Sequence, residues 1–532
     1  MAHVSGVVTA AEPVAPAEPP IPWLGLFAVL LGTFISTLTG RLSTLGILDI
    51  RSAVHAGFDE GAWITTAFTV AQMLITPVAV WIGSIYGPRQ ILIGAALSFA
   101  LTEFLTPFTQ SLQVLLGLQF LNGLGSGCFI PLTLAFVLRN MPLRYWAYGV
   151  AVYALNLELS LNISASLEGW YTDHLSWHWI FWQNVPLALG MAASLFWGVK
   201  RLPSPPEIHR DIYGLASCGT GLALIYAALD QGNRVDWMNS GLFWGLFVAG
   251  VLLLACFIIH ELTTPYPWMD FSVALRWPMP VLLLNIAILR LTILSTSFLI
   301  PYYLGGVRGF RALEIGDTLI WVALPQLIVC PLAAIMMRRM DVRIIAFAGL
   351  CMIIYACMSV AYTLTPLWGS DQFLISQLLQ AVGQSFTLSG MVFISVLNLR
   401  PQDALTFGAM LQIDRLMGGE IGSAFISTVT RIREQRASNL LGLHVQKGDL
   451  IVQQRLAEFG TLLARSGRQA DAAAGLLGNT VRLMATTQAS IDGFVAIAAI
   501  AAVGLVSVAI VLPPPPRTPA SYVPLFHPRR TE

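Results

Sequence analysis

The sequence predicts an all-α protein that crosses a membrane many times. Of its 532 residues, 56% are hydrophobic and only 11% are charged, whereas an ordinary soluble domain has roughly 25% charged residues. A transmembrane helix needs about 20 mostly apolar residues, and apolar segments of that length recur along the chain. The net charge of +1 gives no electrostatic basis for binding nucleic acid, so no such partner is expected.

Fourteen segments are candidate membrane spans, and most connections between them are too short to hold a soluble domain. The seventh and eighth have the weakest patterns, because glycines interrupt them and the polar run DQGNRVDW separates them. The candidates lie at about 23–48, 62–82, 90–109, 112–138, 147–167, 179–198, 212–229, 241–260, 279–304, 315–337, 342–363, 372–397, 404–430 and 491–512.

Three segments lie outside this pattern. Residues 1–21 contain no Lys or Arg, and the apolar run that follows is about twice as long as a signal-peptide core, so we expect an uncleaved, disordered tail. Residues 431–490 are polar but carry apolar residues at helical spacing, as in LIVQQRLAEFGTLLARSG, which predicts one or two amphipathic helices on a membrane surface. Residues 513–532 form a second tail.

The basic residues predict the orientation. Positive residues are retained on the cytoplasmic side of a membrane. With the N-terminus inside, fourteen Lys and Arg residues fall in the cytoplasmic short loops and the C-terminal tail, against four (Arg51, Arg234, Arg308 and Arg311) in the opposite short loops. Both termini are therefore expected in the cytoplasm, and residues 431–490 outside.

The stretch from Glu168 to Leu187, EGWYTDHLSWHWIFWQNVPL, is the richest in polar and aromatic side chains. The stretch joins the fifth and sixth spans. Trp and Tyr rings prefer the boundary between membrane and water, so its aromatic residues are interpreted as a belt at that boundary. The alternative interpretation is a metal site formed by Asp173, His174 and His178, but no further ligand clusters with these residues in the sequence. All six cysteines lie inside apolar runs without metal-ligand spacing, and no metal or other cofactor is expected.

Part of the same stretch, HLSWHWIFWQNVPLALG, resembles a signature of the fourteen-span drug:proton antiporters of the major facilitator superfamily, the EmrB/QacA type. Four further segments resemble that family in the same order, so the resemblance covers nearly the whole chain. They begin at Trp63 (WITTAFTVAQMLITPVAVWIGSIYGPRQ), Leu121 (LNGLGSGCFIPLTLAFVLRNMP), Ile300 (IPYYLGGVRGFRALEIG) and Leu399 (LRPQDALTFGAMLQIDRLMGGEIGSAF).

The resemblance implies two six-helix bundles with two inserted helices. It places the N-terminal bundle at 22–200, the inserted helices at 201–275, and the C-terminal bundle, including the outer segment 431–490, at 276–512. A binding site near the bilayer midplane would lie where the bundles meet, and rocking of one bundle against the other would give alternating access.

The segment GSIYGPRQ resembles the cytoplasmic loop motif that follows the second span in this superfamily. Gly83 would allow close helix packing, and Gly87 would allow an unusual backbone turn. Arg89 would hold a neighbouring helix end or carboxylate across the bundle interface. The acidic position of the motif falls on Ile85 or Tyr86, so the charge lock that the family uses is incomplete here.

The positions that carry proton coupling in the family are altered. Thr39 stands where the first span usually has Asp, with Arg41 two places on, and Gln119 stands where the fourth span usually has Arg. In the fifth span, Gly169 alone remains of the usual Gly-Gly pair. The chain therefore resembles the scaffold more closely than the coupling residues.

Ionisable residues at bilayer depth are the candidates to replace them, because burying a charge there costs about 3 kcal/mol on insertion scales. Glu158 has Asn162 as its neighbour on one helix face and is interpreted either as a proton or cation site or as half of an ion pair. Glu103 is assigned to the membrane interface. The candidate substrate and proton pathway consists of Arg41, Glu158, Asn162, Arg290, Arg415 and Glu420.

The function that the resemblance implies is export of small amphipathic compounds, coupled to protons. Arg41 and Arg290 make an anionic or zwitterionic substrate plausible. An uncoupled facilitator or importer is the alternative, and a membrane enzyme or a non-transporting sensor is the third class, although no catalytic or ATP-binding motif is present. The resemblance also implies a bacterial inner membrane and, in a Gram-negative host, a periplasmic adaptor and an outer-membrane channel as partners.

Overall fold

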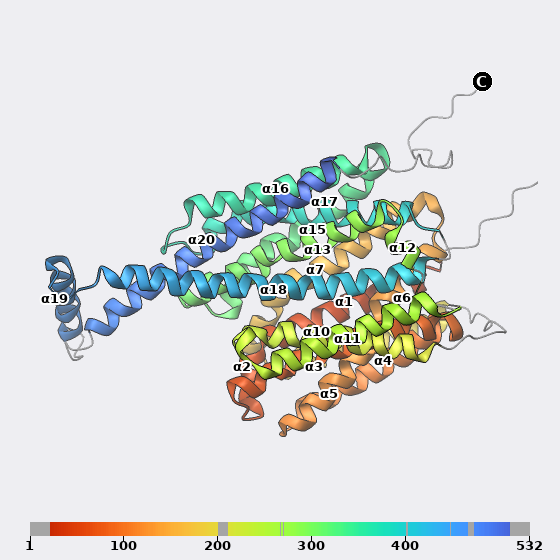
Figure 1. Cartoon of the computed structure of the whole chain (residues 1–532), viewed down its shortest axis with the longest axis horizontal. Coiled ribbons are helices and arrows are strands. Elements are labelled where there is room, and N and C mark those ends of the chain that lie inside the picture. Colours follow the sequence, from red (N-terminus) through yellow and green to blue (C-terminus); the bar gives the residue numbers. More distant parts are fainter. Residues whose placement is uncertain are drawn as a thin grey trace, which may run out of the picture.

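The computed structural model describes residues 22–199, 211–265, 268–269, 271–400, 403–446, 448–465 and 473–510. Every regular element in these ranges is a helix, and the long helices run roughly side by side along the long axis of the molecule (Figure 1). The expected fold class is confirmed: an all-α polytopic membrane protein with two helix bundles and two additional helices. The tails predicted at 1–21 and 513–532 lie outside the described residues.

The N-terminal bundle is built from α1 to α9. Glycines set its tightest contact, because a Cβ atom on Gly123 would lie 2.1 Å from the carbonyl oxygen of Phe68, so α5 packs directly on the backbone of α3. The elements are α1 (Trp23–Leu45), α2 (Ile47–Ala53), α3 (Phe58–Tyr86), α4 (Pro88–Leu105), α5 (Leu112–Gly127), α6 (Phe129–Asn140), α7 (Trp146–His174), α8 (Trp179–Trp182) and α9 (Asn184–Gly198).

The C-terminal bundle follows the short helix α12 (Phe271–Leu275). Its first span is irregular, since π-helical turns at Ser295–Leu299 and Leu304–Arg308 interrupt it, and π-helical turns are frequent at functional sites. The α-helices are α13 (Met279–Thr292), α14 (Ile300–Tyr303), α15 (Ala312–Arg339), α16 (Val342–Thr363), α17 (Leu374–Leu397), α18 (Ala404–Leu443) and α20 (Ala473–Ile510).

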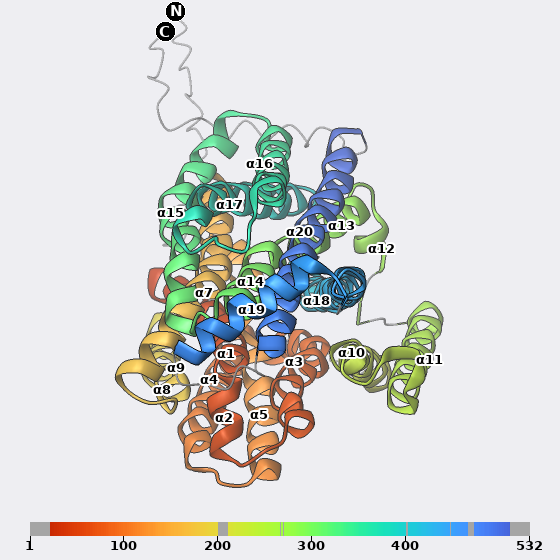
Figure 2. The same cartoon turned by 90° about the vertical axis from the view of Figure 1, so that its left-hand side faces the viewer.

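The inserted helices are α10 (Ile212–Gly232) and α11 (Gly241–Thr263). Tyr226 of α10 belongs to a buried apolar cluster with Met73 of α3 and Met410 of α18, so α10 touches both bundles. Helix α11 packs on α10 and lies at the edge of the molecule (Figure 2). Both weakly patterned spans are therefore helices, but only α10 is in a position to contribute to the interior.

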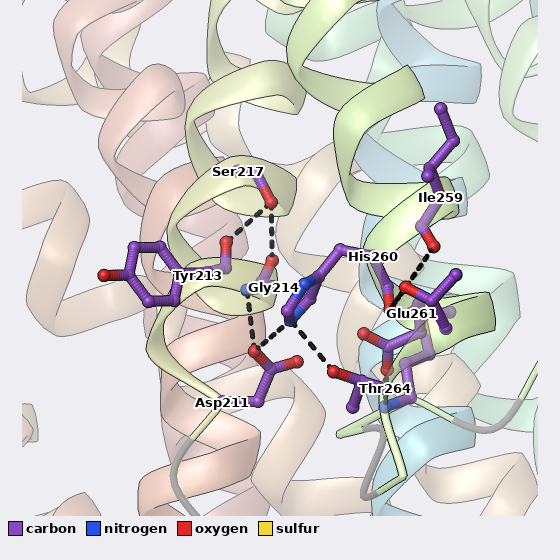
Figure 3. Close-up of polar contacts among 10 residues, drawn as sticks. Asp211, Tyr213, Gly214, Ser217, Ile259, His260, Glu261 and Thr264 are labelled. Carbon is purple, nitrogen blue, oxygen red and sulfur yellow. Dashed lines mark hydrogen bonds and ion pairs between the residues drawn. The ribbon is translucent and has the colours of Figure 1, made fainter.

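A polar clasp holds the starting end of α10 against the end of α11 (Figure 3). Asp211 caps α10 by accepting the backbone N–H of Gly214 at 2.9 Å, and its Oδ1 atom also lies 2.7 Å from Nε2 of His260 on α11. Glu261 accepts the backbone N–H of Met269 at 2.6 Å. The clasp thus ties the two inserted helices to each other and to the segment that leads into the second bundle.

Twelve helices within the described residues are long and apolar enough to cross a bilayer. The two other predicted spans are helical but differ from these twelve. The predicted span 179–198 is divided into α8 and the 15-residue α9, and the predicted span 404–430 falls in α18, which carries Asp414, Arg415 and Glu420 among its apolar residues. The predicted count of fourteen is consistent with this arrangement.

The predicted outer segment 431–490 contains the ends of two long helices and one short helix. Helix α18 has 40 residues and α20 has 38, and a 40-residue helix is about 60 Å long, roughly twice the hydrocarbon thickness of a bilayer. Helix α19 (Leu450–Arg465) lies across their far ends, beyond the bundles (Figure 1).

The two bundles contact each other through bare backbone at two places. A Cβ atom on Gly169 of α7 would lie 2.4 Å from the backbone of Leu313 on α15, and one on Gly408 of α18 would lie 2.4 Å from the carbonyl oxygen of Pro131 on α6. Neither contact leaves room for a side chain at the glycine.

Candidate functional site

A cavity of about 230 Å³ lies where the two bundles and α10 meet. Helices α1, α3 and α7 of the first bundle line it, together with α13 and α18 of the second bundle. Four of the six candidate pathway residues are in its wall, namely Arg41, Arg290, Arg415 and Glu420.

Two of the cavity arginines reach across the boundary between the bundles. Arg41 of α1 donates from NH2 to the carbonyl oxygen of Ser297 at 3.0 Å, and Arg415 of α18 donates from NH1 to the hydroxyl of Thr37 on α1 at 3.4 Å. Rocking of the bundles would change both contacts, so these guanidinium groups are coupled to the relative position of the bundles.

Charge compensation of the cavity arginines is indirect, since Glu158 and Asp414 act on Arg290 from beyond ion-pair distance. Among the residues that the structure describes, no carboxylate oxygen lies within 4.0 Å of Arg41, Arg290 or Arg415. The Nε atoms of Arg41 and Arg290 are buried without a hydrogen-bond partner in the same described ranges. Because a buried unpaired cation is costly, this arrangement is suited to a ligand that brings its own negative charge.

A second, acidic wall was missed by the sequence reasoning. Helix α10 contributes Tyr226 and Asp230 to the cavity, opposite Glu420 of α18. Asp230 is the first residue of the polar run DQGNRVDW and lies one residue past the predicted span 212–229, so the sequence pattern assigns it to a loop. The sequence signal that could have revealed it is its position one helical turn after Tyr226.

Glu158 and Asn162 lie outside the cavity wall, in a buried network that crosses between the bundles. The Glu158 carboxyl accepts hydrogen bonds from the Gln326 amide and the Ser385 hydroxyl, both at 3.2 Å. Asn162 donates to Gln326 at 3.3 Å and to Gln384 at 3.4 Å. The network therefore joins α7 of the first bundle to α15 and α17 of the second.

The Glu158 network lies close enough to the cavity for its charge to act on a residue of the cavity wall. Arg290, which lines the cavity, interacts with the charge of Glu158, although no ion pair forms within 4.0 Å among the described side chains. Oε1 of Glu158 has no hydrogen-bond partner within the described part of the chain. Gln326 and Gln384 were missed by the sequence reasoning, because only ionisable residues were sought at bilayer depth.

The candidate switch loop joins α3 to α4 inside the first bundle. Gly87 has a φ of 83°, which favours glycine, and a Cβ atom on Gly83 would lie 2.6 Å from the Leu132 side chain. Arg89 donates to the carbonyl oxygens of Leu195 and Phe196 at 3.2 and 2.8 Å. Arg89 thus holds the end of a neighbouring helix, α9, in its own bundle.

The assignment of Glu103 to the membrane interface was wrong. Its side chain is fully buried, and Asn122 of the adjacent helix α5 donates to it at 2.7 Å. Thr39 accepts a hydrogen bond from Asn184 at 3.0 Å, while both amide atoms of the buried Gln119 lack a partner among the described residues. The altered family positions thus lie in a polar interior of the first bundle.

The aromatic stretch at the end of α7 and directly after it forms stacked pairs. The ring of His174 stacks on Trp170, with centroids 5.6 Å apart, and that of His178 stacks on Trp177 at 4.3 Å. Both histidines thus pack on tryptophan rings, and the membrane-interface belt stays a prediction.

Two helical bundles that share a polar cavity at their boundary define a membrane transporter of the alternating-access class. The sequence model of the Major Facilitator Superfamily matches residues 29–419, and the chain therefore belongs to that superfamily. The resemblance inferred from the sequence motifs is confirmed.

Within the superfamily, the chain is similar to bacterial proteins named as multidrug exporters. The chain is 25% identical to "Multidrug export protein EmrB" of Haemophilus influenzae over 440 residues, covering 81% of this chain and 86% of the relative. It is 23% identical to the Escherichia coli protein of the same name, covering 76% of this chain and 80% of the relative. The chain is thus a divergent member of the superfamily, similar to EmrB-type exporters.

Solved structures share the fold at low sequence identity. The human organic anion transporter MFSD10 matches with a TM-score of 0.54 at 14% identity, covering 92% of this chain and all (100%) of that chain. The proton:xylose symporter XylE matches with a TM-score of 0.55 at 10% identity, covering 93% of this chain and 96% of that one. These two similarities concern the fold alone.

Proposed function

We propose that this protein exports small amphipathic compounds that carry an anionic group, by proton-coupled alternating access, from a bacterial inner membrane. The observation that carries the proposal is the set of three cavity arginines, Arg41, Arg290 and Arg415, which come from both bundles and have no carboxylate within ion-pair distance among the described residues. The relatives named as multidrug export proteins support the direction of transport.

The cavity arginines give a reason for binding to depend on the conformational state. Arg41 and Arg415 each bond across the bundle boundary, and an anion between them would replace contacts that rocking breaks. A ligand shifts a conformational equilibrium only by its differential affinity for the two states. A bound anion would thereby stabilise the state in which both bundles contribute arginines.

Glu158 is the proposed coupling residue, and Asn162 shares its hydrogen-bond network. Protonation of Glu158 would remove the negative charge that acts on Arg290 and would alter the hydrogen bonds with Gln326 and Ser385, which tie the two bundles together. A proton and a substrate anion would therefore act on the same arginine.

The remaining parts of the proposal concern topology and partners. Both termini would be cytoplasmic, with bundle boundaries at 22–200 and 276–512, and the loop with Gly83, Gly87 and Arg89 would brace the inner end of the first bundle. In a Gram-negative host, the far ends of α18 and α20 with α19 would contact a periplasmic adaptor that leads to an outer-membrane channel.

An uncoupled facilitator or importer is the second candidate, and a specific observation favours it. Thr39 and Gln119 stand at the positions where the related family carries an acid and a base, and neither side chain titrates. If Glu158 serves only to hold the bundles together, the same cavity would transport an anion down its gradient.

The deciding experiment measures lumenal pH in inverted vesicles that are energised to be acidic inside. Anionic, neutral and cationic amphipathic compounds are added to wild type, to Glu158→Gln and to Glu60→Gln, a control at the exposed first turn of α3. Substrate-dependent proton efflux that is lost only in Glu158→Gln supports antiport. Saturable substrate flux without proton movement in wild type would contradict antiport and support the uncoupled facilitator.

A further inference from the structure

The inserted helix α10 forms one wall of the substrate cavity, although its place in the chain separates it from both bundles. Tyr226 and Asp230 line the cavity beside Glu420 of α18. Helix α10 is fixed there by close packing, since a Cβ atom on Gly219 would lie 2.6 Å from the carbonyl oxygen of Leu74 on α3. The position of Asp230 is thus defined by the fold.

The Asp230 carboxylate is held with one oxygen available. The Thr66 hydroxyl and the Gln231 amide both donate to Oδ2, whereas Oδ1 has no hydrogen-bond donor among the described residues. The donors are fixed in turn, because Arg234 donates to Gln231 at 2.7 Å and forms an ion pair with Asp59 at 2.8 Å. These donors fix the position of the Asp230 carboxyl on the cavity wall.

Glu420 lies on the opposite side of the same region. Its side chain is 7% exposed, it contacts the Tyr226 hydroxyl, and it interacts electrostatically with Asp230. Neither carboxyl has an arginine or lysine within 4.0 Å among the described side chains. The Arg234 guanidinium acts on the Asp230 charge from beyond ion-pair distance and is already paired with Asp59. Two neighbouring carboxyls without a direct ion-pair partner, beside an aromatic ring, are suited to a ligand cation.

The wall of the cavity carries both guanidinium groups and carboxyls. Arg290 and Arg415 also line a smaller adjoining space with Tyr153, Leu157 and Ile286. Arg415 and Glu420 are five residues apart on α18, which corresponds to about 7.5 Å along a helix axis. The cavity therefore presents guanidinium groups, two of them next to an apolar space, together with carboxyls.

We propose that Asp230, Glu420 and Tyr226 form a cation subsite, and that the ligand for which the cavity is best suited is a zwitterionic amphiphile whose anionic group lies among the arginines. This inference rests on the proposed function for the anionic half of the ligand. It assigns to α10 a role in selecting substrates.

The test uses the full-length protein in lipid nanodiscs and three probes that share one short alkyl chain. The probes end in a sulfonate, in a sulfobetaine and in a trimethylammonium group, and binding is measured by isothermal titration calorimetry below their micellar concentrations. The variants are Asp230→Asn and Glu420→Gln. Asp173→Asn is the matched control, since Asp173 is exposed at the end of α7 and is outside the cavity.

In wild type, the sulfobetaine should bind more tightly than the sulfonate. Asp230→Asn and Glu420→Gln should each weaken sulfobetaine binding by about tenfold, as expected for a lost hydrogen bond or contact with a charged group, and leave sulfonate binding unchanged. Asp173→Asn should change neither. Having two variants on different helices keeps the test decisive if one of them fails to fold.

An unchanged ratio of sulfobetaine to sulfonate affinity in both variants would overturn the cation subsite. A loss of substrate-driven proton flux in Asp230→Asn, with an unchanged affinity ratio, would also overturn it. The Asp230 carboxyl would then take part in proton transfer and not in binding a ligand cation. If wild type binds no sulfonate but binds the trimethylammonium probe in an Asp230-dependent way, the proposed anionic function fails and the subsite stands.

Discussion

The carboxyl of Glu158 on α7 accepts a hydrogen bond at 3.2 Å from the amide of Gln326 on α15, so a buried acid of the first bundle is held by the second bundle. Gln326 also accepts from Asn162 at 3.3 Å and is fully buried. One amide thus joins both polar residues of α7 to the opposite bundle. Any motion that separates α7 from α15 must break these bonds.

Gln326→Leu should therefore destabilise the protein. The substitution leaves the Glu158 carboxyl and the Asn162 amide each without one partner in a buried place, which costs about 2 kcal/mol per group. Thermal unfolding in detergent measures the stability. Gln377→Leu is the control, because Gln377 is similarly buried and, within the described part of the chain, bonds only to Ser376 beside it on α17. Equal effects of the two substitutions would mean that Gln326 has no special role between the bundles.

Arg415→Gln should weaken binding of an anionic amphiphile by about tenfold, because a charged hydrogen-bond donor is lost. Binding of a neutral compound with the same apolar part should not change. Arg308→Gln, an exposed substitution outside the cavity, should affect neither compound. Equilibrium binding to the purified protein measures both affinities, and a parallel loss for the neutral and anionic compounds would mean that Arg415 only maintains the shape of the cavity.

The main outline of the fold could be predicted from the sequence, because the length of an apolar run determines whether it can cross a bilayer. The exceptions have physical causes. The apolar pattern of 179–198 does not reveal that the helix is divided into α8 and α9, and that of 404–430 is diluted by charges that α18 turns toward the protein interior. The extension of α18 and α20 beyond the bundles leaves no signal in a hydropathy window.

The candidate site was only partly predictable. The position of a residue along a membrane-spanning helix gives its depth in the bilayer, but it does not tell which side of the helix the side chain is on. Arg41, Arg290, Arg415 and Glu420 were identified by depth, and all four line the cavity. Glu103 was at a similar depth but lies between α4 and α5 of one bundle. Asp230 could not be identified, since the packing of α10 against α3 and α18 brings it to the cavity and no local pattern reveals that packing.

Asp211→Ala should destabilise the inserted helices without changing the cavity. The substitution removes the N-cap of α10, worth about 1 kcal/mol, and the contact with His260. Limited proteolysis should then cut more rapidly near the start of α10, while binding of an anionic amphiphile is retained. Asp236→Ala, in the exposed connection between α10 and α11, is the control. Loss of binding in Asp211→Ala would mean that the clasp positions the cavity wall.

The two backbone contacts between the bundles predict opposite effects of two equally small substitutions. Gly408→Ala adds a methyl group 2.4 Å from the carbonyl oxygen of Pro131, and Gly169→Ala adds one 2.4 Å from the backbone of Leu313. Neither backbone can move without separating the helices, and overpacking of this kind costs about 1–3 kcal/mol. Each substitution should therefore disfavour the conformation that closes its own contact.

Hydrogen–deuterium exchange reports which contact opens. Gly408→Ala should increase exchange in α6 and at the start of α18, and Gly169→Ala should increase it where α7 meets α15, because packed bundles move between discrete arrangements. Gly94→Ala is the matched control, since a Cβ atom there would meet nothing within 4 Å. A uniform increase at both contacts in either variant would indicate general destabilisation and would contradict a rocking motion between two closed ends. An increase confined to the substituted contact would mean that the two glycines control opposite sides of one conformational equilibrium.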